Sequence, residues 1–167
     1  MKKIIILGST GSIGRNAIKV LNNLNQFKIV GLAAYNNYQL LARQARCTQP
    51  KMVTIVNKQH YKRLKQKLRS VTITCGEQGI TDMVESTGAN VIICAFARAI
   101  GIWGVVEAIK RKMRICLATK EILVSFGDII MDLVKKHGVE LYPIDSEHSA
   151  IYQCLEGRKK EEVKNII

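Results

Sequence analysis

Short apolar runs alternate with helical patterns along nearly all of this chain, and that alternation limits the fold more than any other feature of the sequence. The apolar runs predict strands at residues 3–7, 28–34, 52–56, 71–75, 90–95, 114–118 and 139–144. Helical periodicity between them predicts helices at residues 12–24, 38–47, 58–70, 78–86, 101–112 and 122–137. Runs that are apolar on both faces are typical of parallel strands covered by helices on both sides. We therefore predict an α/β fold with a doubly wound, mostly parallel, Rossmann-like sheet.

The predicted sheet accounts for residues 1–143 as a single domain, because no linker-like segment or internal repeat interrupts it. In the first predicted helix, Ile13 begins an apolar stripe that continues at Ala17 and Leu21. The sequence ends in Asn165-Ile166-Ile167, a largely apolar run that we interpret as the opening of a further strand.

Composition excludes several classes of protein. Hydrophobic residues make up 47% of the 167 residues and charged residues 23%, which is a balance typical of soluble globular chains and not of disordered or collagen-like ones. No apolar run approaches the ~20 residues that span a bilayer, so we expect no membrane partner. The five cysteines are widely spaced and form no C-x-x-C pair. We expect reduced thiols in a cytosol-like compartment, and neither a disulfide framework nor a zinc framework.

Charge is distributed very unevenly along the chain. The formal net charge is +13, and residues 1–76 contain 14 Lys and Arg but no Asp or Glu. Such a basic half favours a phosphate-bearing partner, either a nucleotide or a nucleic acid, although it also fits a simple solvated face. No helix-turn-helix, zinc finger or RNA-binding aromatic pair accompanies the basic residues at 62–69, so we do not expect a nucleic-acid partner.

A glycine-rich turn directly follows the first predicted strand and opens the first predicted helix. Its glycines, Gly8, Gly11 and Gly14, have the spacing G-x-x-G-x-x-G. Glycines at such a turn let the backbone approach a pyrophosphate, and the helix N-terminus offers free N–H groups and a positive dipole end. A glycine turn can also be purely structural. Its place within a strand–helix–strand unit favours a dinucleotide site.

The end of the second predicted strand bears on the choice of dinucleotide. Enzymes that use NAD usually place Asp or Glu there to accept from the ribose hydroxyl. Here the segment reads Tyr35-Asn36-Asn37 and no acid is nearby. A carboxylate would repel a 2′-phosphate, whereas amide donors tolerate one, so the sequence favours NADP. The same residues would also suit a plain turn without any bearing on the cofactor.

Two carboxylates follow the last predicted strand. Side chains two apart in an extended segment point the same way, so Asp145 and Glu147 are predicted to share one divalent ion. Hard oxygen ligands suit magnesium or manganese. Asp-Ser-Glu is also a good helix start, with a cap and an acid in the first turn. Lys120 and Glu121 follow the strand predicted at residues 114–118, at an edge where open α/β sheets bind ligands, although they would also suit a surface pair.

Together these segments resemble the 1-deoxy-D-xylulose 5-phosphate reductoisomerases. The resemblance rests on three blocks in order, which are Gly8-Ser9-Thr10-Gly11-Ser12-Ile13-Gly14, Ala118-Thr119-Lys120-Glu121 and Pro143-Ile144-Asp145-Ser146-Glu147-His148-Ser149-Ala150-Ile151-Tyr152-Gln153. It implies an NADPH-dependent oxidoreductase that makes 2-C-methyl-D-erythritol 4-phosphate in non-mevalonate isoprenoid biosynthesis. It also implies a homodimer, cytoplasmic or plastid according to the organism. Residues 1–143 would form the NADPH-binding domain, and residues 144–167 would begin a second, catalytic α/β domain.

The resemblance also assigns roles to single residues. It implies contacts with NADPH from Gly8, Thr10, Gly11, Ser12, Ile13, Gly14, Asn36, Asn37, Thr119 and Glu121. It implies a metal ion, Mn²⁺ or Mg²⁺, on Asp145 and Glu147, and contacts with a small phosphorylated sugar from Lys120, Ser146 and Glu147. Of these, Lys120 and Glu147 are expected to be catalytic. The metal would polarise the substrate carbonyl and NADPH would reduce the resulting aldehyde.

The chain also departs from the family it resembles. The family usually has Gly-Lys-Asn where this chain has Tyr35-Asn36-Asn37, so a cation that faces the 2′-phosphate is missing. The family's third metal-binding carboxylate, its phosphate-gripping residues and its substrate-covering loop would lie beyond residue 167. We therefore expect the chain to bind dinucleotide without turnover on its own. The alternatives are a non-catalytic dinucleotide-binding module with the same sheet and a nucleic-acid-binding protein built on the basic half.

Overall fold

A computed structural model describes residues 1–165, and its strands all join one sheet. The strands are β1 (Lys2–Leu7), β2 (Phe27–Ala34), β3 (Met52–Ile55), β4 (Thr72–Cys75), β5 (Val91–Cys94), β6 (Arg114–Leu117) and β7 (Leu141–Pro143). They are hydrogen-bonded in the order β4-β3-β2-β1-β5-β6-β7, and every pairing is parallel. The strand predictions are confirmed to within two residues at each end. Ile166 and Ile167, in the further strand predicted at the end of the chain, lie outside the described residues.

Helices connect these strands. They are α1 (Ser12–Asn22), α2 (Tyr38–Thr48), α3 (Tyr61–Lys67), α4 (Gly76–Ser86), α5 (Ile102–Lys110), α6 (Lys120–His137) and α7 (Ser146–Leu155), with short 3₁₀ turns at Lys58–His60, Arg98–Gly101 and Lys160–Glu162. The helix predicted at residues 58–70 is a 3₁₀ turn followed by the shorter α3. α6 is kinked at Phe126, where the backbone leaves helical geometry just before Gly127. Kinks are typical next to glycine and serine.

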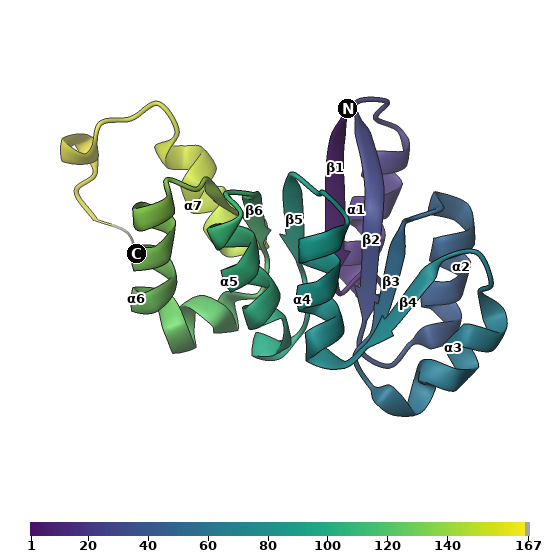
Figure 1. Cartoon of the computed structure of the whole chain (residues 1–167). Coiled ribbons are helices and arrows are strands. Elements are labelled where there is room, and N and C mark those ends of the chain that lie inside the picture. Colours follow the sequence, from purple (N-terminus) through teal and green to yellow (C-terminus); the bar gives the residue numbers. More distant parts are fainter. Residues whose placement is uncertain (166–167) are drawn as a thin grey trace.

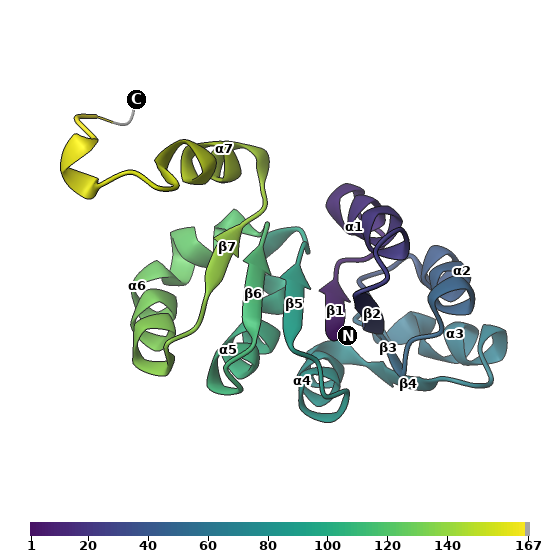
Figure 2. The same ribbon diagram turned by 90° about the horizontal axis from the view of Figure 1, so that it is seen from above.

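The helices form a layer on each face of the sheet (Figure 1, Figure 2). Viewed from above, α1, α2 and α3 cover one face and α4, α5 and α6 cover the other. The first face buries Ile18, Leu41 and Leu64 against the strands, and the second buries residues such as Met83 and Ile109. A core on both faces explains why the central strands are apolar along their whole length. The doubly wound parallel α/β fold is therefore confirmed.

Strand register brings the carboxyl ends of the strands to one edge of the sheet. Leu7 at the end of β1 pairs with Ala33 of β2 and with Cys94 of β5. Cys94 in turn pairs with Leu117 of β6, which pairs with Pro143 of β7. The chain runs outward from β1 to β4 and then returns to β5 on the other side of β1. The order therefore reverses between β1 and β5, which is where open α/β sheets bind their ligands.

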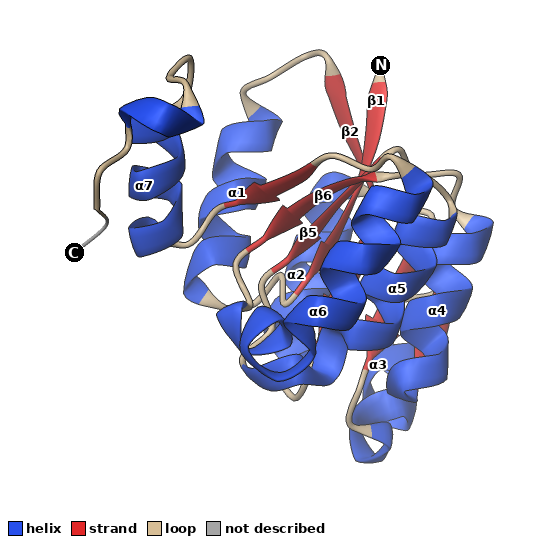
Figure 3. Cartoon of the chain, turned by 90° about the vertical axis from the view of Figure 1, so that its left-hand side faces the viewer, coloured by secondary structure: helices blue, strands red, loops and turns tan. Residues whose placement is uncertain are grey.

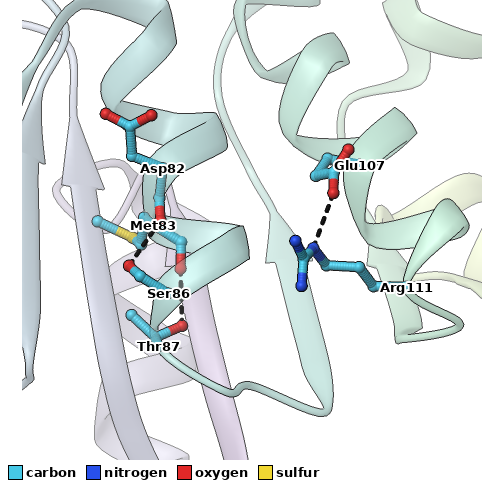
Figure 4. A network of polar contacts seen from close by, with 6 residues as sticks. All are labelled: Asp82, Met83, Ser86, Thr87, Glu107 and Arg111. Carbon is cyan, nitrogen blue, oxygen red and sulfur yellow. Dashed lines mark hydrogen bonds and ion pairs between the residues drawn. The ribbon is translucent and has the colours of Figure 1, made fainter.

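Local polar contacts lie at the C-terminal ends of two helices on the second face, α4 and α5 (Figure 4). At the end of α4, the Ser86 hydroxyl donates to the Asp82 carbonyl at 2.6 Å, and the Thr87 hydroxyl donates to the Met83 carbonyl at 2.7 Å. On α5, Arg111 is paired with the Glu107 carboxylate one turn earlier, at 2.7 Å. These bonds satisfy helix carbonyls and side chains away from the carboxyl edge of the sheet. They support the scaffold and take no part in the site.

α7 lies at the margin of the molecule, beyond the strands (Figure 3). Its Tyr152 ring packs edge-on against Tyr142 of β7, with ring centroids 5.7 Å apart. No helix among the described residues is both long enough and apolar enough to cross a bilayer. Whether residues 144–167 open a separate domain stays a prediction.

Candidate functional site

The glycine turn after β1 is held in place by its own first amides. Gly8 has a φ of +82°, and its N–H and that of Ser9 both donate to the Ala33 carbonyl at 2.9 Å. The Gly11 N–H donates back to the Gly8 carbonyl at 3.0 Å. These three amides fix the turn against the end of β2, so they are not available to a ligand.

The next amides, at the start of α1, are free. Gly11 is the N-cap residue of α1 and supplies no side chain to cap the helix. Within residues 1–165, the N–H groups of Ser12 and Ile13 donate to no protein acceptor. The first amides of a helix carry a partial positive charge and bind anions well. The anion-binding part of the turn is therefore the start of α1 and not the whole glycine motif.

The three glycines have different roles in this turn. A Cβ on Gly8 would lie 2.3 Å from the Ala95 carbonyl oxygen, and a Cβ on Gly14 would lie 2.3 Å from the Gly8 carbonyl oxygen. Both glycines are therefore needed for close backbone packing. A Cβ on Gly11 would come no closer than 3.3 Å to other atoms, and Gly11 is exposed. Gly11 is the glycine that leaves room above the helix terminus, and direct contacts from Gly8 and Gly14 with a cofactor stay a prediction.

A pair of side-chain hydrogen bonds fixes the turn to α2. The Ser9 hydroxyl donates to Gln44 Oε1 at 2.8 Å, and Gln44 Nε2 donates to the Ser9 carbonyl at 2.8 Å. Ser9 is fully buried. No sequence pattern indicated this contact, because Gln44 lies in the middle of an ordinary amphipathic helix.

A cavity of about 310 Å³ opens directly over the start of α1. It is lined by Gly11, Ser12, Ile13, Ala95, Phe96, Ala97, Ala118, Lys120 and Glu121. The structure thus brings the predicted glycine turn together with Lys120 and Glu121, at the carboxyl ends of β1, β5 and β6. Ile13 is the first residue of the predicted apolar stripe of α1. It is 37% exposed and lines this cavity, whereas Ile18 is buried. Ala95, Phe96 and Ala97, which follow β5, were not among the predicted site residues, although their place beside the reversal of strand order could have indicated them.

Thr119 is buried, although its neighbours Ala118 and Lys120 line the cavity. Its side chain is buried, and its hydroxyl donates to the Phe96 carbonyl at 2.8 Å and lies 3.3 Å from the Cys94 carbonyl. These contacts join the ends of β5 and β6 beneath the cavity. Thr119 does not line the cavity, and its contact with a cofactor stays a prediction.

The asparagines after β2 are ordered by hydrogen bonds. Asn37 caps α2, since its Oδ1 accepts from the Leu40 N–H at 3.0 Å. Asn36 Oδ1 accepts from Asn57 Nδ2 at 2.8 Å, and Asn57 follows the neighbouring strand β3. Both predicted asparagines are exposed at the carboxyl edge. Asn57 was not among the predicted site residues, although its place at the end of β3, beside β2, could have indicated it.

The geometry predicted for Asp145 and Glu147 is wrong. The segment is not extended, because α7 begins at Ser146 and Asp145 is its N-cap residue. Asp145 Oδ2 lies 3.3 Å from the His148 backbone nitrogen and 2.6 Å from His148 Nδ1. Glu147 lies in the first turn and accepts from the Ser146 hydroxyl at 2.9 Å. Asp145 supplies an acceptor for a free N–H group at the start of α7, so the capping interpretation of Asp-Ser-Glu is confirmed.

The two carboxylates are nevertheless close enough to act on each other. Burial of the Asp145 carboxyl would raise its pKa, but hydrogen bonds from the His148 side chain and backbone outweigh burial and lower it. The pKa of Glu147 is lowered by a hydrogen bond from its own backbone, by Ser146 and by the positive charge of Lys120, against the negative charge of Asp145. Lys120, Asp145 and Glu147 therefore form one charged group at the ends of β6 and β7.

Lys120 stands between two cavities. The second has a volume of about 490 Å³ and lies under α7, and its lining is mostly apolar with Lys120, Asp145 and His148 among its polar residues. A metal ion would find hard oxygen donors in the carboxylates of Asp145 and Glu147. The described residues hold no group of three side chains suited to a metal ion. The residues present therefore fit part of a magnesium or manganese site.

Comparison with known proteins identifies relatives of this chain. The family model for 1-deoxy-D-xylulose 5-phosphate reductoisomerase matches residues 4–127. The reductoisomerases of Thermoanaerobacter pseudethanolicus and Chlamydia caviae are 46% and 37% identical to the chain, and both alignments cover all of it. The chain spans only 44% and 45% of those relatives' own lengths.

Solved structures agree with the sequence relatives. The Zymomonas mobilis reductoisomerase in complex with NADPH superposes with a TM-score of 0.86 at 34% identity, over 92% of this chain and 41% of that one. A reductoisomerase with NADPH, fosmidomycin and magnesium superposes with a TM-score of 0.87 at 31% identity, over 92% of this chain and 39% of that one. The Synechocystis biliverdin reductase, at 12% identity and a TM-score of 0.62, shares the fold alone. By its sequence and by its fold, the chain belongs to the 1-deoxy-D-xylulose 5-phosphate reductoisomerase family.

Proposed function

We propose that this chain is the NADPH-binding portion of a reductoisomerase that converts 1-deoxy-D-xylulose 5-phosphate to 2-C-methyl-D-erythritol 4-phosphate. The observation that carries the proposal is the cavity at the start of α1, where the amides of Ser12 and Ile13 have no partner among the described residues. It lies where the strand order reverses, and a relative of the same family was solved with NADPH. A pyrophosphate has the charge and size that such a helix terminus binds.

Different residues around the cavity would bind different parts of the dinucleotide. Ser12 and Ile13 would bind the pyrophosphate, with Thr10 and Gly11 beside them and Asn36 toward the 2′-phosphate. Ile13 offers an apolar side chain to the cavity, and Glu121 also lines it. Bound there, NADPH would supply a hydride and a divalent ion would polarise the substrate carbonyl.

The charged group beyond the cavity would bind the phosphorylated sugar and the metal. Lys120 is exposed and adjoins both cavities, so its ammonium can hold an anionic substrate beside the cofactor. Asp145 and Glu147 would provide two metal ligands, magnesium or manganese, and Ser146 would reach the substrate. We further propose, from the family alone, a homodimer located in the cytoplasm, or in a plastid in a plastid-bearing organism.

Binding and turnover separate the parts of this proposal. The chain is expected to bind NADPH in a fluorescence titration, and NADPH more tightly than NADH. With 1-deoxy-D-xylulose 5-phosphate and magnesium it is expected to show no oxidation of NADPH, because the described residues hold only part of a metal site. Absence of NADPH binding would refute the proposal, and measurable turnover would show that these residues suffice for catalysis.

The incomplete metal group also favours a second candidate, a non-catalytic dinucleotide-binding module. Manganese binding distinguishes the two, because the paramagnetic ion broadens NMR signals of residues near it. If the chain is part of a reductoisomerase, manganese is expected to broaden signals around α7. This broadening is expected to be lost in Asp145→Ala and retained in Asp128→Ala, because Asp128 is an exposed acid on α6. No broadening at α7 in the unaltered chain would favour the module.

A further inference from the structure

The ends of β2 and β3 stay paired beyond the strands themselves. After the last register pair, Ala34 with Ile55, the Val56 N–H donates to the Ala34 carbonyl at 2.9 Å. The Asn57 N–H then donates to the Tyr35 carbonyl at 3.0 Å. This backbone ladder carries Asn57 alongside Asn36 at the exposed edge of the sheet.

The hydrogen bonds around Asn57 fix which way both amides face. Asn57 Oδ1 accepts from the Gln59 N–H at 3.0 Å, and this bond caps the 3₁₀ turn at Lys58–His60. The other end of the same amide, Nδ2, donates to Asn36 Oδ1 at 2.8 Å. An asparagine amide has one oxygen and one nitrogen, so Asn36 is left with its Nδ2 group, and its two N–H donors, facing away from Asn57.

The surroundings of this amide pair suit an anion. Residues 1–76 contain no Asp or Glu, and the residue after Asn57 is Lys58, an exposed cation. The Oδ1 of Asn37 is already bonded to the Leu40 N–H, so it does not turn a second carbonyl oxygen outward. In a doubly wound sheet, the end of the second strand is where the ribose of a bound dinucleotide lies.

We propose that Asn57 is a positioning residue for cofactor specificity, which holds Asn36 with its amide donors toward the 2′-phosphate of NADPH. The inference rests on the proposed function and extends it, because it places the specificity for the phosphorylated cofactor partly at the end of β3. It explains how the site selects the phosphorylated cofactor although Tyr35-Asn36-Asn37 contains no basic residue. Asn36 touches the phosphate, and Asn57 acts through Asn36.

Asn57→Asp tests this inference sharply. Aspartate keeps an oxygen for the Gln59 N–H and remains a good capping residue, so the fold is expected to survive. Its second oxygen replaces the donor that faced Asn36, which must then turn its own Nδ2 inward and its Oδ1 outward. NADPH affinity is expected to fall about tenfold or more, in line with the loss of hydrogen bonds to a charged group. NADH affinity, measured by the same fluorescence titration, is expected to change less than about threefold.

Three further variants separate orientation from charge and from folding. Gln59→Glu places the same charge two residues away without touching Asn36, and the NADPH-to-NADH affinity ratio is expected to stay close to that of the unaltered chain. In an Asn36→Ala background, Asn57→Asp is expected to lose most of its effect on that ratio. Asn57→Ser keeps a capping oxygen and adds no charge, and it is expected to weaken NADPH binding while NADH binding is retained.

The outcomes distinguish this inference from the proposed function. An affinity ratio unchanged by Asn57→Asp and Asn57→Ser would overturn the inference, and so would an equal effect of Asn57→Asp with and without Asn36. In both cases the chain would still bind NADPH, so the proposed function would stand. If the unaltered chain binds neither nucleotide, both fail. A merely structural role for Asn57 would weaken NADPH and NADH binding alike, and this too would overturn the inference.

Discussion

Gly14→Ala should destabilise the fold, whereas Gly11→Ala should weaken NADPH binding, although both replace a glycine of the same motif. A Cβ at Gly14 would meet three backbone atoms within 2.9 Å, the nearest being the Gly8 carbonyl oxygen at 2.3 Å. No side chain can rotate to relieve that overlap, so the penalty should lie near the upper end of overpacking, about 3 kcal/mol. Alanine recovers about 1 kcal/mol of helix propensity. The net loss of about 2 kcal/mol should lower the Tm by roughly 4–8 °C in a chain of this size.

Gly11→Ala should leave the fold nearly intact and weaken binding. Gly11 has a φ of −74°, which alanine adopts readily, and its Cβ would stay 3.3 Å from the Gly8 carbonyl oxygen. The expected change in the free energy of unfolding is about 1 kcal/mol or less. The added methyl group would project beside the free amides of α1, and loss of one hydrogen bond to pyrophosphate should reduce NADPH affinity about tenfold.

The pair is measured by thermal unfolding followed by circular dichroism and by NADPH fluorescence titration of each variant. A Gly11→Ala variant that lowered the Tm as much as Gly14→Ala, or that bound NADPH as tightly as the unaltered chain, would refute these different roles for the two glycines.

Three further predictions concern side chains around the site. Ser9→Ala and Gln44→Ala should each destabilise the chain by about 1 kcal/mol, with a coupling energy of similar size in the double-mutant cycle, and additive effects in urea unfolding would contradict the contact. Thr119→Val leaves the buried Phe96 carbonyl without its hydroxyl partner and should lower the free energy of unfolding by about 2 kcal/mol. Burial raises the pKa of Cys94 to about 11, so at pH 8 a thiol reagent should modify the exposed Cys47 and not Cys94 until the chain unfolds. Because the unfolded thiol loses its proton near pH 9 and the folded one near 11, stability should fall as the pH rises between these values, and a flat profile there would contradict the burial.

The sheet could be predicted because its signal is local. Runs such as Ile4–Leu7 are buried along their whole length, so a continuous apolar stretch and a following glycine suffice to identify a strand and its end. The location of the site could be predicted from the same pattern, because parallel strands place all their carboxyl ends at one edge of the sheet. Lys120 and Glu121 were expected beside the glycine turn for this reason, and both line its cavity.

The rest of the site depends on contacts that a linear pattern does not carry. Gln44 and Asn57 matter because they meet residues 35 and 21 positions away along the chain. Only the extended geometry of Asp145 and Glu147 was wrong, because the sequence Asp-Ser-Glu suits both an extended pair of ligands and a helix start, and the choice depends on where α7 begins. Their role as metal ligands stays a prediction. Thr119 was assigned by its neighbours, whereas its burial under the ends of β5 and β6 is a property of the packed sheet.

A crystal structure of this chain with NADPH tests the central claim most directly, through the distances from the backbone nitrogens of Ser12 and Ile13 to the nearest pyrophosphate oxygens. We predict hydrogen bonds of about 2.7–3.2 Å at one or both nitrogens, with the Gly8 and Ser9 amides still bonded to the Ala33 carbonyl. A nucleotide bound elsewhere on the sheet, with no phosphate oxygen within reach of the start of α1, would contradict the account.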